Sequence, residues 1–507
     1  MKFRAGVVIL LIALLATAFP VGATELPEQP GWWTGYNEAI DYYYVRPGYP
    51  KYSTHARYIG ELSGTWYEMG LQYGQRAGDL VRLVFEGYYD DIYNTIRNED
   101  KIVTDARRFG QYLSQILPEA VEFMRGIADG SSSEFAKSTY AHIGTDMDKV
   151  LIINHYFALR RVTGTQHTWP GTVAIAEPSL AYVPAEETLP ACTGVVVIGG
   201  LDGPTKDRTT IHGGTKDQQF FPQLYQVTYT TNPSDPNANR IWTISSAGEI
   251  GGQMAGNDKG VIVSGYAGGN AKGLWSYGLE WNIGDWYAAC FADTAEEAAN
   301  ILTLGRPGYI EATGSKMIQP AWGINWLISD LRDARCVEIV PGRFAVRKPG
   351  DMGEDRFLIC TNHCVATWSI DENLERTDVP MTEFGDESGT FSGLSVSGTR
   401  YWTQWWNVKY NYGNIDRNMV MQWYANHYYI DKNGVRVDYV WDDTYGWVSS
   451  NQKTTVPCRH RAIPNDHLGN TTDAKVGVAQ DLAFYFTVGR PCEWVGPWDV
   501  QSLKYTK

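Results

Sequence analysis

The stretch PACTGVVVIGG at residues 190–200 places Cys192 at the start of an apolar run. A short apolar run bounded by turn residues predicts a buried strand. The turn signal LDGP at 201–204 follows, and a second strand-like stretch, TIHGGTKD, ends at Asp217. The two strands are predicted to pair as a hairpin with Cys192 at its outer end. A thiol at a strand tip, with a carboxylate on the neighbouring strand, is a candidate nucleophile; the alternative is a buried structural cysteine.

The first 23 residues have the pattern of a cleaved signal peptide. Lys2 and Arg4 precede an apolar core at 7–18, and the small residues VGA at 21–23 form a cleavage site. The core is too short to cross a bilayer comfortably. We therefore expect a secreted or extracytoplasmic protein, with a retained N-terminal membrane anchor as the alternative.

Charge and composition limit the classes of partner. The chain of 507 residues has a formal net charge of −14, and loss of the two basic residues of the signal peptide takes the mature chain near −16. Such an acidic chain is a poor partner for nucleic acid. The 19 Trp and 32 Tyr supply core area and also line sugar or acyl clefts, so they leave the ligand class open.

Cysteine usage fits an exported protein. An oxidising compartment favours disulfides, and an odd count leaves at least one thiol unpaired. If Cys192 is the free thiol, the other six can form up to three bridges, in pairs that the sequence does not define. The seven are Cys192, Cys290, Cys336, Cys360, Cys364, Cys458 and Cys492.

No metal or cofactor is predicted. One group of residues could be interpreted as zinc ligands, but it lacks paired C-x-x-C spacing. Its members are His363, Cys364, Cys458, His460 and His467.

The periodicity of the chain changes at Cys192. Helical spacing runs from about 64 to 130, with a second helix start at Pro118, and a third helix is expected at 149–159. After Cys192 a capping-box pattern at 293–296 opens one helix, and the other predicted elements are strands. These strands are 224–229, 241–245, 260–264, 336–339 and 344–347. The last two flank Pro341-Gly342-Arg343, which predicts a hairpin turn. Helices followed by strands, with no linker or internal repeat, predict an α+β fold with helices packed on antiparallel sheets.

Eight short motifs occur in an order that resembles a known family. They are GTWYEMGLQYG (64–74), CT (192–193), HGGTKD (212–217), GNDKGV (256–261), TNH (361–363), SGTRY (397–401), CRH (458–460) and GRPC (489–492). In this order the motifs resemble those of the isopenicillin-N acyltransferase-like family of N-terminal-nucleophile (Ntn) hydrolases. No single motif is specific, whereas eight in the same order are hard to attribute to chance.

The resemblance implies a four-layer αββα sandwich made as a precursor that cuts itself. The Cys192 thiol would attack the carbonyl of Ala191, and hydrolysis of the ester would leave Cys192 as a new N-terminus. The mainly helical chain 24–191 and the catalytic chain 192–507 would stay associated as one domain. A free α-amine titrates near ~8, so it can act as the base beside its own nucleophile.

The resemblance also implies roles for individual residues. Asp217 would orient the amine or thiol of Cys192, Asn362 would donate to the oxyanion, and Arg400 would hold the charges of the site in register. Tyr266 or Ala267 stands where the family has an oxyanion or substrate-loop residue. Taken alone, Asp217 fits a turn, Asn362 a turn or cap, and Arg400 a structural ion pair.

Two positions of the third motif depart from the family pattern. Gly214 and Thr215 replace an Arg and an Asn, so the expected guanidinium is absent. Strand alternation predicts that Lys216, next to Asp217, points to the opposite face. His212 is interpreted as a hydrogen-bonded core residue; the alternative is a place in the substrate or oxyanion site.

The leading hypothesis is an exported, self-processing cysteine Ntn hydrolase or acyltransferase. It would act on a small acyl-amide or acyl-ester through an acyl-cysteine intermediate. A phospholipase B-like lipid amidase or esterase on the same fold is one alternative. The other is an inactive, aromatic-rich surface or glycan-binding protein.

Overall fold

The computed structural model describes most of the chain from residue 56 onward. The described ranges are 56–161, 191–218, 225–268, 277–309, 313–363, 365, 395–438, 440–442, 446–448, 457–458, 470–489, 491 and 498–504. The predicted signal peptide and the residues directly before Ala191 lie outside them.

The part of the chain before Cys192 forms one strand and a group of helices, in line with its helical periodicity. Thr65 caps the first helix and forms a reciprocal capping box with Glu68, and Pro118 occupies the first turn of its helix as predicted. The elements are β1 (Arg57–Gly64), α3 (Trp66–Ile96), α4 (Glu99–Ile116), α5 (Pro118–Phe135), α6 (Asp146–Asn154) and α7 (Tyr156–Arg161).

Helices α3 and α5 approach each other with almost no side chain between their backbones. A Cβ atom on Gly70 would lie 2.0 Å from the carbonyl oxygen of Phe123, and one on Gly126 would lie 2.2 Å from that of Tyr67. Only glycine fits at such distances, so these residues fix how the two helices cross.

Eight strands form the first sheet. Neighbouring strands are antiparallel, except that β1 runs parallel to β4. The order is β1, β4 (Gln226–Pro233), β5 (Ile241–Ser246), β6 (Met254–Asn257), β7 (Ile262–Ala267), β8 (Ile324–Ser329), β9 (Ala334–Val340) and β10 (Arg343–Arg347). The predicted hairpin around Pro341-Gly342 is confirmed as the β9–β10 pair.

Six strands form the second sheet, and all neighbours in it are antiparallel. Its order is β11 (Phe357–Cys360), β2 (Ala191–Val197), β3 (Ile211–Gln218), β16 (Asn470–Val478), β17 (Ala483–Val488) and β18 (Asp499–Ser502). Two strand pairs stand outside both sheets, namely β12 (Tyr428–Ile430) with β13 (Arg436–Asp438) and β14 (Val440–Asp442) with β15 (Gly446–Val448). A 3₁₀ turn, Ala479–Asp481, joins β16 to β17.

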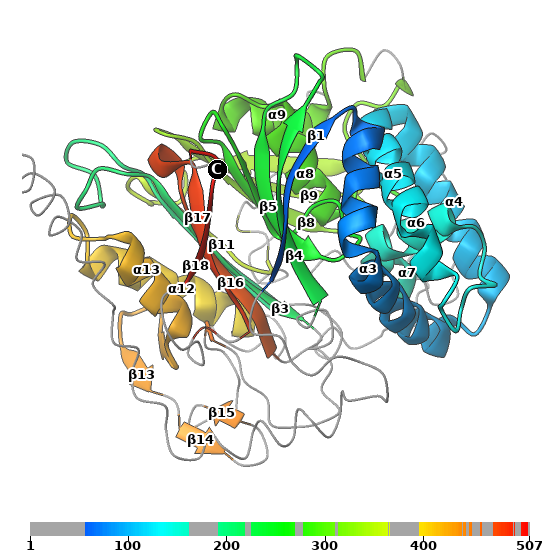
Figure 1. Cartoon of the computed structure of the whole chain (residues 1–507). Helices are drawn as coiled ribbons and strands as arrows, with labels where there is room; N and C mark the ends of the chain where they lie inside the picture. Colours follow the sequence, from blue (N-terminus) through cyan, green and yellow to red (C-terminus); the bar gives the residue numbers. More distant parts are fainter. Residues whose placement is uncertain are drawn as a thin grey trace, which may run out of the picture.

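The two sheets are stacked, and helices cover their outer faces (Figure 1). Helices α8 (Trp281–Phe291), α9 (Ala295–Leu304) and the N-terminal group lie on the side of the eight-stranded sheet. Helices α12 (Ser395–Tyr410) and α13 (Arg417–Ala425) cover the six-stranded sheet. The predicted α+β sandwich of antiparallel sheets flanked by helices is therefore confirmed.

Apolar side chains fill the spaces between these layers. The largest cluster lies between the eight-stranded sheet and its helices, and a second includes the helix-facing side of the six-stranded sheet. A small third cluster joins the sheets around Cys192, Tyr266 and Leu358. None of the helices in the described part of the chain has the length and apolar character that a membrane span requires.

Candidate active site

Strands β2 and β3 form the predicted hairpin, with Cys192 at its outer end. In their register Ala191 lies opposite Asp217, and Cys192 lies opposite Lys216. Residues directly opposite in an antiparallel pair share a face of the sheet. Cys192 and Lys216 therefore both face the eight-stranded sheet, while Asp217 is on the side of α12 and α13.

This register corrects the prediction made for Lys216. Alternation along the strand turns Lys216 away from Asp217, and we therefore did not expect it to replace the missing guanidinium near the thiol. The structure keeps Lys216 and Asp217 on opposite faces, but Lys216 is the residue that shares the face of Cys192. It places the Lys216 side chain in the space between the sheets, with only 2% of its surface exposed.

Two residues distant in the sequence meet at the backbone of Cys192. The Cys192 N–H donates to Oδ1 of Asn362 over 2.7 Å. Arg400 Nη2 donates to the same Oδ1 atom over 2.7 Å, and Nη1 donates to the Cys192 carbonyl and, over 2.8 Å, to Thr193 Oγ1. The structure thus brings together Cys192, Asn362 and Arg400.

The elements around the site explain how Asn362 is held. It follows β11, which pairs with β2 so that Cys360 lies opposite Gly194. The backbone N–H of Asn362 donates to Ser397 Oγ over 2.7 Å, and Nδ2 donates to the carbonyl of Ala267 over 2.8 Å. Asn362 is therefore fixed by the first turn of α12 on one side and by β7 on the other.

Asp217 lies at the end of β3, beside the start of β2. Its Oδ1 accepts a hydrogen bond from Thr471 Oγ1 over 2.7 Å. Thr471 lies on β16 directly across from Asp217, so a third strand holds this carboxylate. Asp217 is completely buried.

Burial raises the pKa of the Cys192 thiol to about 11, and the negative charge of Asp217 adds to this increase. Three groups act in the opposite direction, namely the backbone N–H of Asp217 and the cations of Arg400 and Lys216. The thiol is consequently protonated at neutral pH. Ionisation there depends on the balance between the carboxylate and the two cations.

Tyr266 lies across the β2–β3 pair close to Cys192. A Cβ atom on Gly194 would be 2.3 Å from its hydroxyl oxygen, and one on Gly214 would be 2.6 Å away. Glycine at position 214 therefore makes room for the tyrosine in this chain. The Tyr266 hydroxyl accepts a hydrogen bond from Ser264 over 2.8 Å.

His212 belongs to a buried chain of hydroxyl contacts at the other end of β3. Its ring nitrogens lie 2.6 Å from Ser264 Oγ and 2.9 Å from Ser329 Oγ. Burial lowers its pKa to about 3, so the ring is neutral. It is four residues from Lys216 along the strand, roughly 13 Å, and this placement favours its interpretation as a core residue.

The described residues contain no group of three or more His, Cys, Asp or Glu side chains suited to a metal ion. His363 is buried, with Nδ1 lying 2.8 Å from Ser397 Oγ and 3.1 Å from Thr361 Oγ1. Cys364, His460 and His467 lie outside the described part of the chain, so the zinc interpretation is not tested at those positions.

Four of the cysteines within the described ranges carry free thiols, which departs from the expectation that most of them form disulfides. Cys192, Cys290, Cys336 and Cys360 are free and buried. Cys458 is buried as well. Cys364 and Cys492 lie outside the described residues, so the pairing predicted for them is not tested.

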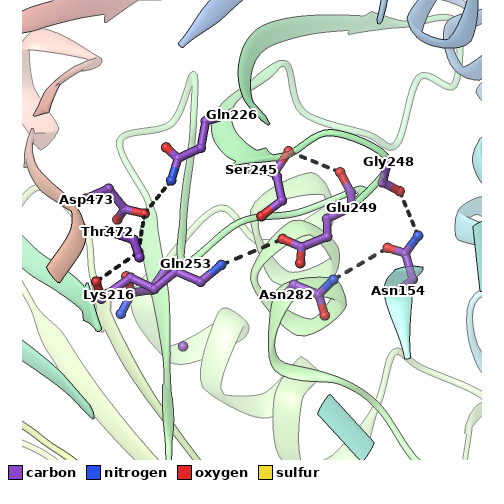
Figure 2. A network of polar contacts seen from close by, with 12 residues as sticks. Asn154, Lys216, Gln226, Ser245, Gly248, Glu249, Gln253, Asn282, Thr472 and Asp473 are labelled. Atoms are coloured by element: carbon purple, nitrogen blue, oxygen red, sulfur yellow. Dashed lines mark hydrogen bonds and ion pairs between the residues drawn. The ribbon is translucent and has the colours of Figure 1, made fainter. Parts of the chain in front are cut away.

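A buried polar network between the sheets was not anticipated from the sequence (Figure 2). Lys216 Nζ lies 3.8 Å from Glu249 Oε2, and Lys475 Nζ forms an ion pair with Asp473 and donates to Gln253 Oε1 over 3.0 Å. The register of β2 with β3 would have placed Lys216 here, but the 13 residues that connect the strands (198–210) leave that register open in the sequence.

Comparisons with known proteins find similarity only among solved structures. No family model and no curated protein matches the chain. A mutant of conjugated bile acid hydrolase from Clostridium perfringens aligns with 12% identity and a TM-score of 0.31, covering 62% of this chain and 97% of that one.

Two further structures give similar values. The Caenorhabditis elegans ortholog of N-acylethanolamine-hydrolyzing acid amidase has 11% identity and a TM-score of 0.31, and the alignment covers 57% of this chain and 93% of that one. Penicillin V acylase from Agrobacterium tumefaciens has 11% identity and a TM-score of 0.31, with 62% and 86% covered. At this identity the similarity concerns the arrangement of helices and strands.

Proposed function

We propose that the protein is a self-processing amide hydrolase or acyltransferase of the Ntn class, with Cys192 as its nucleophile. The observation that carries this proposal is the convergence of Asn362 and Arg400 on the backbone of Cys192. A structural cysteine in a strand needs neither an amide nor a guanidinium from distant elements. The similar structures are named as a hydrolase, an amidase and an acylase, but at their low TM-scores the proposal does not depend on them.

The proposed cut converts one peptide bond into two chain ends. The sulfur of Cys192 attacks the carbonyl carbon of Ala191, a C–S bond forms, and the C–N bond to Cys192 breaks as its nitrogen takes a proton. Water then hydrolyses the thioester, which leaves a carboxylate on Ala191 and a free amine and thiol on Cys192. Residues 24–191 and 192–507 become the two chains.

The contacts at Cys192 suit this change. The nitrogen that donates to Asn362 Oδ1 in the uncut chain is the nitrogen that becomes the α-amine. Asn362 is thus already in place to orient that amine as a base next to the thiol. Arg400 donates to the Cys192 carbonyl, so it holds Cys192 in position while the bond between Cys192 and Ala191 breaks.

Substrate turnover follows the same route with an acyl-amide or acyl-ester in place of Ala191. The thiolate takes the acyl group, and water or an acceptor amine then removes it. An amide NH2 has two donor hydrogens, so Asn362 can hold Ala267 and also donate to the oxyanion of the intermediate. We also propose export through the N-terminal 23 residues, which would place this reaction outside the cytoplasm.

The direct test is the intact mass of the purified protein together with activity on a substrate panel. We expect two fragments, one of which begins at Cys192, and release of amine from at least one acyl-amide or of alcohol from an acyl-ester. A single uncut chain that binds glycans and cleaves no acyl bond would favour the inactive binding protein instead.

The rate of self-cleavage should depend steeply on pH. Because the Cys192 pKa in the uncut chain is raised to about 11, the thiolate fraction increases about tenfold per pH unit below that value. Precursor made in a cell-free system should therefore be cut roughly tenfold faster for each unit between pH 6 and 9, as followed by the appearance of the Cys192 fragment. A rate independent of pH would contradict attack by a thiolate that forms in a pre-equilibrium.

A further inference from the structure

Three neighbouring strands place Cys192, Lys216 and Asp473 in one row. Cys192 on β2 lies opposite Lys216 on β3, and Lys216 lies opposite Asp473 on β16. Opposed residues of antiparallel strands share a face. All three side chains therefore face the space between the sheets, with Lys216 between the thiol and the carboxylate.

Lys216 crosses this space and is anchored in the opposite layer. Its Nζ atom lies 3.8 Å from Glu249 Oε2 and 4.7 Å from the centre of the Trp281 ring. Tyr88 on α3 donates to Glu249 Oε1 over 2.8 Å, which fixes the anion from a third layer (Figure 2 shows Glu249 within the network). Both partners of the ion pair are almost completely buried, so little water screens the ammonium.

The second lysine of the network is arranged differently. Lys475 lies opposite Gly214, which is two residues before Lys216 on β3, and it forms an ion pair with Asp473. Burial lowers the pKa of Lys475, and the positive charge of Lys216 adds to this decrease. Asp473 thus compensates Lys475, while Lys216 is the lysine in direct register with the thiol.

Charged and titratable groups lie near Cys192 on both faces of the six-stranded sheet. They are Asp217 and Lys216 on β3, Lys475 on β16, Arg400 on α12, Tyr266 on β7, Cys336 on β9 and Cys360 on β11. Arg400 is committed to the Cys192 carbonyl, to Thr193 and to Asn362. Among these cations, Lys216 is the one that lies directly opposite Cys192 on the neighbouring strand and on the same face of the sheet.

We propose that Lys216 is a positioning residue for Cys192, whose ammonium, held by Glu249, stabilises the anionic form of the sulfur. This role rests on the proposed function of Cys192 as nucleophile. A cation in a weakly screened interior favours the charged form of a nearby acid. It thus offsets the burial and the Asp217 carboxylate that disfavour the thiolate.

The test is the pH dependence of Cys192 alkylation by iodoacetamide, measured by peptide mass on the processed protein. Lys216→Met removes the charge at similar length, and its profile should move to higher pH by about one unit, which slows labelling at pH 7.5 about tenfold. The pH profile of kcat/KM should move in the same direction. Lys216→Arg retains the charge and should label within about threefold of the wild type.

Two further variants separate this role from a purely structural one. Lys216→Met with Glu249→Gln removes both charges, leaves no unpaired buried anion, and should keep the displaced profile. Lys149→Met removes another buried lysine, which pairs with Asp146 over 3.0 Å on α6, and should label like the wild type.

A folded double variant with the wild-type profile would overturn the proposal and reduce Lys216 to the structural partner of Glu249. A shift in Lys216→Met that Lys216→Arg does not reverse would also overturn it. A wild-type chain that stays uncut and inert toward acyl-amides and acyl-esters would instead refute the proposed function, and with it this role of Lys216.

Discussion

Cys192→Ala is expected to yield a single uncut chain without activity. The variant lacks the sulfur that attacks Ala191, so the peptide bond stays intact and no acyl-enzyme can form. Removal of a catalytic nucleophile typically lowers turnover by about 10⁴-fold or more. The measurements are intact mass for the cut and release of amine from an acyl-amide for turnover.

Cys360→Ala is the matched control for this experiment. Cys360 is buried in the same small cluster between the sheets, on the strand next to Cys192. The substitution removes a thiol that is buried in the same cluster but takes no part in the proposed reaction. Cutting and turnover should therefore persist. If Cys192→Ala is still cut at the same bond, a separate protease makes the cut.

Asn362→Ala is expected to lower turnover about 100-fold or more in protein that has been cut. The substitution removes the proposed oxyanion donor and also the acceptor that orients the Cys192 nitrogen. Asn362→Asp separates the two losses, because it keeps the acceptor oxygens and loses the NH2 group. We expect it to remain about as slow as alanine if donation to the oxyanion dominates.

Asn239→Ala provides the comparison for loss of a buried amide elsewhere. Asn239 is 8% exposed, and its Nδ2 donates to the Ala292 carbonyl over 2.9 Å, much as Asn362 does to Ala267. Its replacement should lower thermal stability and leave turnover per titrated thiol unchanged. Normal turnover in both Asn362 variants would return Asn362 to a structural turn residue.

Local patterns in the sequence predicted several elements of the fold. The helix that starts at Pro118 and the β9–β10 hairpin depend on residues close together in the chain, so periodicity and turn chemistry were sufficient. Pairings between distant strands carry no such local signal. The parallel pairing of β1 with β4 and the pairing of β16 with β3 were accordingly not predicted.

In the candidate site, too, features that depend on neighbouring residues were predicted from local patterns, and contacts between distant residues were not. The hairpin from Cys192 to Asp217 is local and was predicted, whereas the contacts of Cys192 with Asn362 and Arg400 span 170 and 208 residues and were suggested only by the family resemblance. The face of Lys216 was predicted wrongly. A side chain changes face with every residue along a strand, so an uncertain register is enough to exchange Lys216 and Asp217.

Strand β1 precedes the proposed cut and hydrogen-bonds to β4, which follows it. In the intact chain this contact forms within one molecule, at a rate independent of concentration. After the cut the same contact would join two molecules, so recovery from denaturation would become a second-order process. The mature protein would then assemble efficiently only once, as a precursor, and its lifetime would be governed by how slowly β1 and its helices detach.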